Sequence, residues 1–66
     1  MYNDNEILNV EQLADLLQVG YSTVYRLLKK EEISSFRIGN CYRIQRSEVM
    51  EYIIRKSKRK YISNNL

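Results

Sequence analysis

The chain has 66 residues, a formal net charge of +3, a single cysteine and no histidine. A chain of this length forms one small domain with a thin hydrophobic core, and one thiol without an imidazole leaves no residues for a zinc site or for conventional acid–base or nucleophilic catalysis. The composition therefore predicts a binding module without metal or cofactor, and it argues against an enzyme.

The sequence shows no feature of membrane insertion or export. No stretch approaches the roughly 18 consecutive apolar residues of a membrane span, and residues 1–6 have neither the basic start nor the apolar run of a signal peptide. Cys41 has no second cysteine with which to form a disulfide within the chain, which fits a reducing compartment. We therefore expect a cytoplasmic protein with no membrane partner.

Charge is unevenly distributed along the chain. Residues 1–33 hold three basic and six acidic side chains, a net charge of −3, whereas residues 34–66 hold eight basic and two acidic side chains, a net charge of +6. A basic half on a mixed chain is typical of a surface that binds a polyanion such as nucleic acid. Charge alone is equally consistent with an ordinary solvated surface.

The first regular element is expected to be a helix. Residues 1–6 are polar and unpatterned, which predicts a flexible N-terminus. A helix is then predicted from residue 10 to residue 17 or 18, because Asn9 can cap it and Gln12 stands where a capping box needs a glutamine. Its apolar residues recur at helical spacing and form one stripe: Val10, Leu13, Ala14 and Leu17.

A short break over residues 18–20 precedes a second predicted helix. Val19 is expected to be a buried anchor in this break, and Gly20 to supply conformational freedom. The second helix should begin at Tyr21 or Ser22 and end near Lys30. Its buried stripe is predicted to contain Val24, Leu27 and Leu28, with Ser22, Arg26 and Lys29 on the opposite face.

The outer face of the second helix has two interpretations. A solvated surface helix can be equally polar. The preceding helix and the three-residue turn favour another role, because this arrangement presents a second helix to the major groove of DNA.

A β-hairpin is predicted over residues 36–44, with two alternatives for its loop. A three-residue loop over residues 39–41 places Arg37 opposite Arg43, whereas a two-residue loop over residues 39–40 places Arg43 beside Phe36 on the core face. We prefer the three-residue loop because it keeps every charge out of the core. The two arginines then share the outer face, where paired like charges favour a bound phosphate, and the core face holds Phe36, Ile38, Tyr42 and Ile44.

A third helix is expected after the hairpin. Ser47 can cap it, and Glu48 in its first turn complements the helix dipole. Arg46 stands just before this cap, beside the hairpin. The apolar residues that return this helix to the core are Val49, Tyr52 and Ile53.

Residues 55–66 are predicted to form a basic C-terminal tail. Five of the six residues from 55 to 60 are cationic. Such a run is usually the solvated, fraying end of a helix, and it can also lie along phosphates.

One distributed pattern covers residues 8–53, about 46 of the 66 residues. It consists of Leu8, Leu13, Ala14, Leu16, Leu17, Val19, the runs 22–27, 36–39 and 42–44, and Tyr52. This pattern resembles the excisionase-type, MerR-like winged helix-turn-helix DNA-binding domain. The resemblance implies a small α+β fold, mainly α, with three helices and a two-stranded hairpin wing in the order α-α-β-β-α. The implied DNA-binding domain covers residues 7–54.

The resemblance also implies which residues contact DNA. In the resembled family the second helix enters the major groove as the recognition helix, and the wing lies against the minor groove or the flanking backbone. Carried over by position, the contacts are Tyr21, Ser22, Thr23, Tyr25, Arg26 and Lys29 on the helix, and Arg37, Asn40 and Arg43 on the wing. To these we add Lys30, Arg46 and, as weaker tail contacts, Lys56, Lys58, Arg59 and Lys60.

The sequence departs from the family pattern at several positions. The family commonly has a basic pair at the wing tip, where this chain has Asn40 and Cys41. It also commonly has serine at Gly20, glycine at Glu31 and proline at Ser34.

Three functional hypotheses follow. The first is an excisionase, or recombination directionality factor, that binds and bends double-stranded DNA at the end of a mobile element, beside further copies of itself, and assists a tyrosine-type integrase. The second is a small transcriptional regulator of a phage or mobile element, bound at an operator. The third is a protein-interaction module whose cations bind an acidic partner.

Overall fold

The computed structural model describes the backbone of residues 6–65 and the side chains of residues 6–57. It contains β1 (Ile7–Leu8), α1 (Val10–Leu17), α2 (Tyr21–Lys29), β2 (Phe36–Ile38), β3 (Cys41–Gln45) and α3 (Arg46–Asn65). The three strands form an antiparallel sheet in the order β1-β3-β2. This small, mainly helical α+β architecture confirms the predicted fold class, with one strand more than expected. The predicted flexible N-terminus lies outside the described residues except for Glu6.

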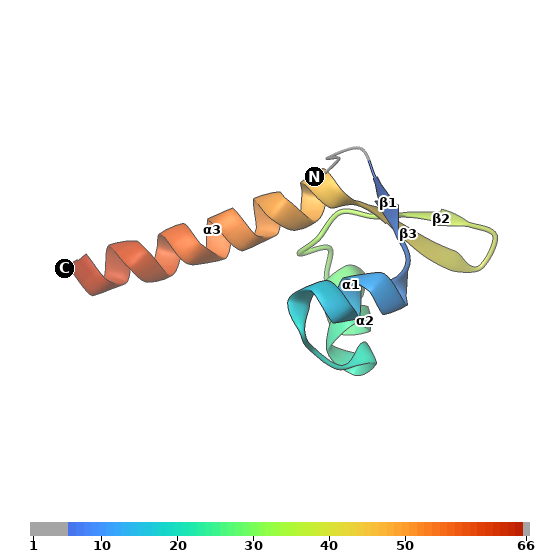
Figure 1. Cartoon of the computed structure of the whole chain (residues 1–66), viewed down its shortest axis with the longest axis horizontal. Helices are drawn as coiled ribbons and strands as arrows, with labels where there is room; N and C mark the ends of the chain where they lie inside the picture. The colour runs from blue at the N-terminus through green and yellow to red at the C-terminus, as the bar shows by residue number, and fades with distance from the viewer. Residues whose placement is uncertain (1–5, 66) are drawn as a thin grey trace.

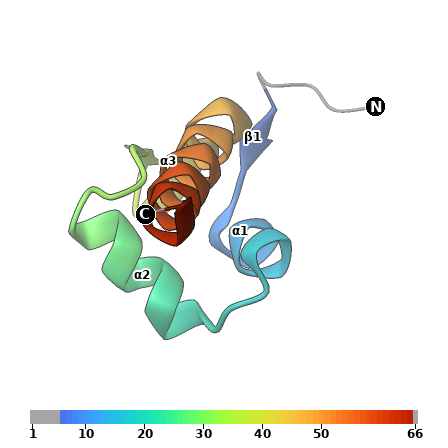
Figure 2. The same cartoon turned by 90° about the vertical axis from the view of Figure 1, so that its left-hand side faces the viewer.

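Helices α1 and α2 and the sheet form a compact body from which α3 extends (Figure 1). Figure 1 shows α1 and α2 below the sheet, the β2–β3 hairpin at one end of the molecule and α3 leading to the other. Figure 2 looks along α3 and shows α1 and α2 on two sides below it. The longest dimension, 45 Å against 28 and 18 Å for the others, therefore follows α3 and the hairpin.

The start of α1 is fixed by a capping box, as the sequence predicted. The Asn9 side chain accepts a hydrogen bond from the backbone N–H of Gln12 at 2.7 Å, and the Gln12 side-chain oxygen accepts one from the backbone N–H of Asn9 at 2.9 Å. Leu8 and Leu13, on either side of the cap, are both buried. These contacts fix the angle at which the chain enters α1.

The turn between α1 and α2 differs from the expectation in its details. Gln18, at φ 58°, adopts the left-handed conformation, and the N–H of Val19 donates to the carbonyl of Ala14 at 3.0 Å. A left-handed residue followed by this hydrogen bond is a Schellman motif, and it ends α1 with Gln18 as the C-cap. Gly20 is extended and caps α2. Val19 is 37% exposed, so the expectation of a buried anchor is wrong.

A second Schellman motif ends α2. Glu31 has φ 57° and its N–H donates to the carbonyl of Leu28, while the N–H of Glu32 donates to the carbonyl of Leu27 at 3.0 Å. The left-handed conformation favours glycine. Glu31 therefore occupies a strained backbone position.

The hydrophobic core is shared by almost every element. Its fully buried members are Leu8, Leu13, Ala14, Val24, Leu28, Ile33, Ile44 and Val49. Leu17, Leu27, Tyr42, Tyr52 and Ile53 are half-buried against it. Strand β2 contributes no buried side chain.

The hairpin has the two-residue loop, so the preferred three-residue loop is wrong. Arg37 pairs with Tyr42, and Phe36 pairs with Arg43. Gly39 has φ 63°, and glycine at the first of two loop residues is what a type II′ turn requires. Such primed turns match the twist of the adjoining strands, which explains the shorter loop.

The corrected register changes which hairpin residues face the core. Arg37 and Arg43 project from opposite faces of the ribbon, because their positions differ by one step in the pleat. Phe36 and Ile38 are 44% and 61% exposed and do not belong to the core. The longer loop would be favoured only if the Phe36 face of the hairpin were buried. Since Phe36 is 44% exposed, Arg43 beside it is half-buried and is not enclosed in the core.

Strand β1 and the start of α3 were not anticipated. Leu8 pairs with Ile44, and a strand of two residues is too short to show an alternating pattern in sequence. Helix α3 begins at Arg46, so Ser47 lies in its first turn and the predicted Ser47 cap is wrong. The backbone of α3 continues through the segment predicted to be a tail as far as Asn65.

Replacing Leu28 by alanine is expected to lower the free energy of unfolding by about 2–4 kcal/mol, because its side chain is 3% exposed and a cavity would remain. Leu27→Ala is the matched control, with a smaller expected loss because Leu27 is only half-buried. Chemical denaturation measures both. Equal losses would contradict this orientation of α2.

Glu31→Gly is expected to raise the free energy of unfolding by about 0.5–1 kcal/mol, because glycine relieves the left-handed backbone strain. Lys30→Gly, one residue earlier at φ −82°, should instead lower it, since no strain is relieved there. Thermal melting of the two variants gives the comparison. A Glu31→Gly variant that melts below the parent would disprove this account of the helix end.

Candidate nucleic-acid interface

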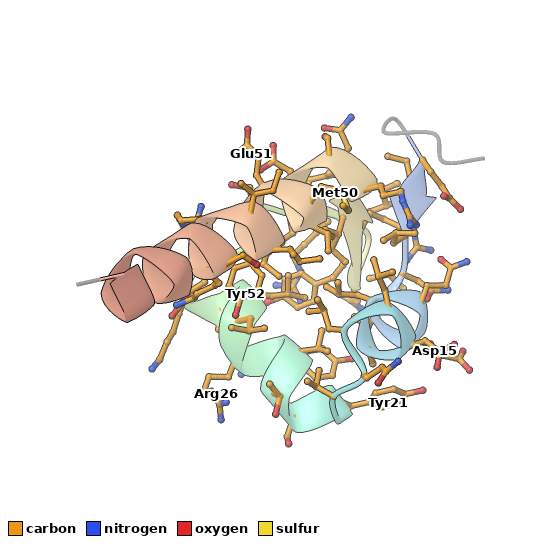
Figure 3. The ribbon with its side chains drawn as sticks, turned by 60° about the vertical axis from the view of Figure 1, so that its left-hand side comes forward. Asp15, Tyr21, Arg26, Met50, Glu51 and Tyr52 are labelled. Atoms are coloured by element: carbon orange, nitrogen blue, oxygen red, sulfur yellow. The ribbon has the colours of Figure 1, made fainter. Side chains whose placement is uncertain are left out.

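The exposed face of α2 is polar at its start and cationic at its end. Tyr21, Ser22, Tyr25, Arg26, Lys29 and Lys30 are exposed. Thr23 is half-buried, and Val24 and Leu28 are buried beneath this face. Helix α2 contains no acidic residue. Figure 3 shows Tyr21 and Arg26 directed away from α3, so the predicted recognition face is open to a ligand.

The α2 face and the wing are joined by aromatic contacts. The ring of Tyr25 on α2 lies 6.0 Å from the ring of Tyr42 on β3, with an interplanar angle of 58°. The guanidinium carbon of Arg37 lies 4.6 Å from the centroid of the Tyr42 ring. Arg37 therefore shares a surface with α2. Sequence reasoning assigned Tyr42 to the core and missed its place in this contact.

A hollow of about 410 Å³ separates the start of α1 from α2 and the wing. Its lining brings together four of the predicted contacts, Tyr25, Arg37, Asn40 and Arg43, with Tyr42 and the start of α1, where Glu11 supplies a negative charge. Although the two arginines project from opposite faces of the ribbon, both line this hollow. The Arg43 guanidinium also donates to the backbone carbonyl of Tyr42 at 2.9 Å.

A second hollow, of about 420 Å³, lies on the other side of Arg37. Its lining includes Lys29 at the end of α2, the two serines of the following loop, Arg37 and Tyr42. Glu31 also lines it and supplies a negative charge. Arg37 is thus accessible from both hollows, with a cation of α2 beside one of them.

Arg46 does not lie with the other wing candidates. It is 8% exposed, and its guanidinium lies 3.7 Å from the carboxylate of Glu6. Its backbone N–H donates to the carbonyl of Glu6 at 2.8 Å. These contacts tie the start of α3 to the segment before β1. We therefore leave Arg46 out of the candidate interface.

The first cations of the predicted tail contact the protein itself. Lys56 Nζ lies 3.5 Å from a carboxylate oxygen of Glu32, and Arg55 donates to the Glu32 backbone carbonyl at 2.8 Å. Both cations lie within 6 Å of the centroid of the Tyr52 ring, at 5.7 and 5.8 Å. Figure 3 shows Tyr52 on the side of α3 that faces α2. The side chains of Lys58, Arg59 and Lys60 lie outside the described residues.

The part of the chain that the structure describes holds neither a candidate metal cluster nor a candidate membrane span. In that part, no group of three or more His, Cys, Asp or Glu residues could hold a metal ion. No helix there is both long enough and apolar enough to cross a membrane.

Two helices joined by a three-residue turn, with the second exposing its cations, form the arrangement by which helix-turn-helix proteins bind DNA. Residues 7–57 match the model of the family described as helix-turn-helix domain. The chain belongs to this family. Helix-turn-helix domains are DNA-binding domains and typically have no enzymatic activity. The match does not distinguish excisionase-type or MerR-like domains from other members.

The relatives of this helix-turn-helix domain give no more specific function. Uncharacterized proteins of Mycobacterium bovis and Mycobacterium tuberculosis are 41% identical to it over 54 residues, which is 82% of this chain and 47% of each relative. The chain thus spans about half the length of the curated relatives it matches. No solved structure matches it.

Proposed function

We propose that this helix-turn-helix protein recognises a specific DNA sequence, with α2 in the major groove and the wing along the neighbouring backbone. The observation that supports this proposal is the continuity of one surface. Lys29 at the end of α2 and Arg37 of the wing line the same hollow, and the Tyr25–Tyr42 contact joins α2 to the wing.

The proposed contacts divide into base readout and phosphate binding. Arg26 lies in the middle of the exposed face of α2, where a guanidinium can donate two hydrogen bonds to a guanine edge. Lys29, Lys30, Arg37 and Arg43 lie at the edges of that surface and are assigned to phosphates. The remaining proposed contacts are Tyr21, Ser22, Thr23, Tyr25 and Asn40. In this proposal residues 7–54 form the DNA-binding domain, and Lys58, Arg59 and Lys60 follow it as weaker phosphate contacts.

Within this role we favour an excisionase that assists a tyrosine-type integrase, a reading that rests on the sequence resemblance. The direct test is an excision assay with the integrase encoded nearest to this gene, in the presence and absence of the protein. An unchanged excision rate would remove the excisionase hypothesis. Repression of a neighbouring promoter in a reporter assay would then favour the regulator. Retention by an acidic protein without retention by duplex DNA would favour the interaction module.

Arg26→Ala is expected to cost about 1–3 kcal/mol of binding on a duplex selected by the protein from a random library, and much less on a scrambled duplex. The reason is the loss of hydrogen bonds to a base edge, which only the selected sequence supplies. Fluorescence anisotropy titrations on the two duplexes measure the ratio. Equal proportional losses would show that Arg26 binds a phosphate.

Arg43→Ala is expected to weaken binding to the selected and scrambled duplexes by the same factor, because phosphates are present in both. The slope of log K against log salt concentration should fall by about one unit. Salt titrations of parent and variant measure the slope. A loss confined to the selected duplex would instead assign Arg43 to base readout.

A further inference from the structure

Tyr42 occupies the junction between the wing and the recognition helix. Its side chain is half-buried, and it shares a face of β3 with Ile44, which is fully buried. The Tyr25 ring of α2 lies 6.0 Å away, and Arg37 of β2 stacks at 4.6 Å. One aromatic side chain thus contacts the core, the recognition helix and a wing arginine.

The outer half of the wing has little other anchorage within residues 6–57. Strand β2 buries none of its three residues, and Phe36 and Ile38 are exposed. Strand β1 pairs only with Ile44 and Gln45, at the base of the hairpin. The angle between the wing and α2 therefore depends strongly on what Tyr42 contacts.

We propose that Tyr42 is a positioning residue that holds the Arg37 guanidinium at a fixed place relative to α2, ready for a DNA phosphate. This inference rests on the proposed function. A guanidinium stacked on an aromatic ring keeps its N–H donors free at the edge of its plane, where a phosphate can accept two hydrogen bonds. Because the ring restricts the arginine side chain before binding, less conformational entropy is lost when the phosphate binds.

The surroundings of Arg37 fit this role. Arg37 lines both hollows. The salt bridges of the described residues involve Glu6 and Glu32, and Arg37 belongs to neither of them. Glu11 and Glu31 line these hollows but form no ion pair with Arg37, so its charge remains available to an anion. Lysine at this position would keep the charge but could not stack as a plane or donate in a bidentate manner.

The experiment is a double-mutant cycle on a fluorescently labelled duplex of mixed sequence, with binding measured over a range of salt concentrations. Tyr42→Leu should weaken binding roughly three- to tenfold, the range expected when one long side chain must be immobilised on binding instead of beforehand. Tyr42→Phe keeps the ring and should bind like the parent. In an Arg37→Ala background, Tyr42→Leu should have little further effect on affinity, because Tyr42 acts through Arg37.

Thermal melting identifies variants that fail to fold. If Tyr42→Leu does not fold, Arg37→Lys gives the same test from the other partner: affinity should fall while the salt slope stays unchanged, since the charge is kept but the stacking is lost. Equal losses from Tyr42→Leu in the parent and Arg37→Ala backgrounds would overturn the inference, and so would parent-like binding by Arg37→Lys. Absence of duplex binding by the parent protein would instead overturn the proposed function.

Discussion

The burial of Ile44 is the interaction on which the rest of this small protein depends. Ile44 lies on the central strand, pairs with Leu8 of β1 and is fully buried among side chains of the helices. Burial of such an aliphatic side chain stabilises the fold by about 1.5–3 kcal/mol, a large share for a chain of this size. Because β3 also carries Tyr42 and Arg43 and leads directly into α3, the same burial fixes the wing and the third helix.

The distribution of charge over the surface follows from the order of the elements. The exposed acidic residues Glu11 and Asp15 lie on α1, whereas the exposed cations Arg26 and Lys29 lie on α2 and Lys30 directly follows it. Figure 3 shows Asp15 and Arg26 well apart. Because the two helices carry opposite charges, the α2 side of the pair attracts a polyanion and the α1 side does not. The modest net charge of the chain therefore understates the charge of the α2 face.

Much of the fold could be predicted from local sequence patterns, because those patterns reflect local physics. The Asn9–Gln12 box starts α1, and apolar spacing identifies the face of α2 that carries Val24 and Leu28. The hairpin register could not be deduced in this way. It depends on the fit between a type II′ turn and strand twist, and on β2 extending beyond the core, neither of which composition reveals. The left-handed conformation of Gln18, between α1 and α2, was likewise not predicted, because conformational freedom in that turn was expected at Gly20.

The candidate interface was predictable to a similar degree. The exposed positions on α2 follow from its periodicity, since residues three or four apart lie on the same face of a helix. The wing was harder, because the place of Arg37 depends on the register and on a ring from another strand. The burial of Arg46 and the pairing of Lys56 with Glu32 join residues far apart in sequence. Such long-range partners have no local signal.

The direct passage from β3 into α3 has a consequence for the architecture of longer proteins built on this domain. With no loop between Gln45 and Arg46, the strand and helix meet at a rigid joint, and Glu32 holds the helix further along through Arg55 and Lys56. Figure 1 shows α3 ending far from the hairpin. A module fused in helical register after α3 would stand at a fixed distance and rotation from DNA bound by this domain. Adding or removing one residue of α3 would rotate that module by about 100° around the helix axis.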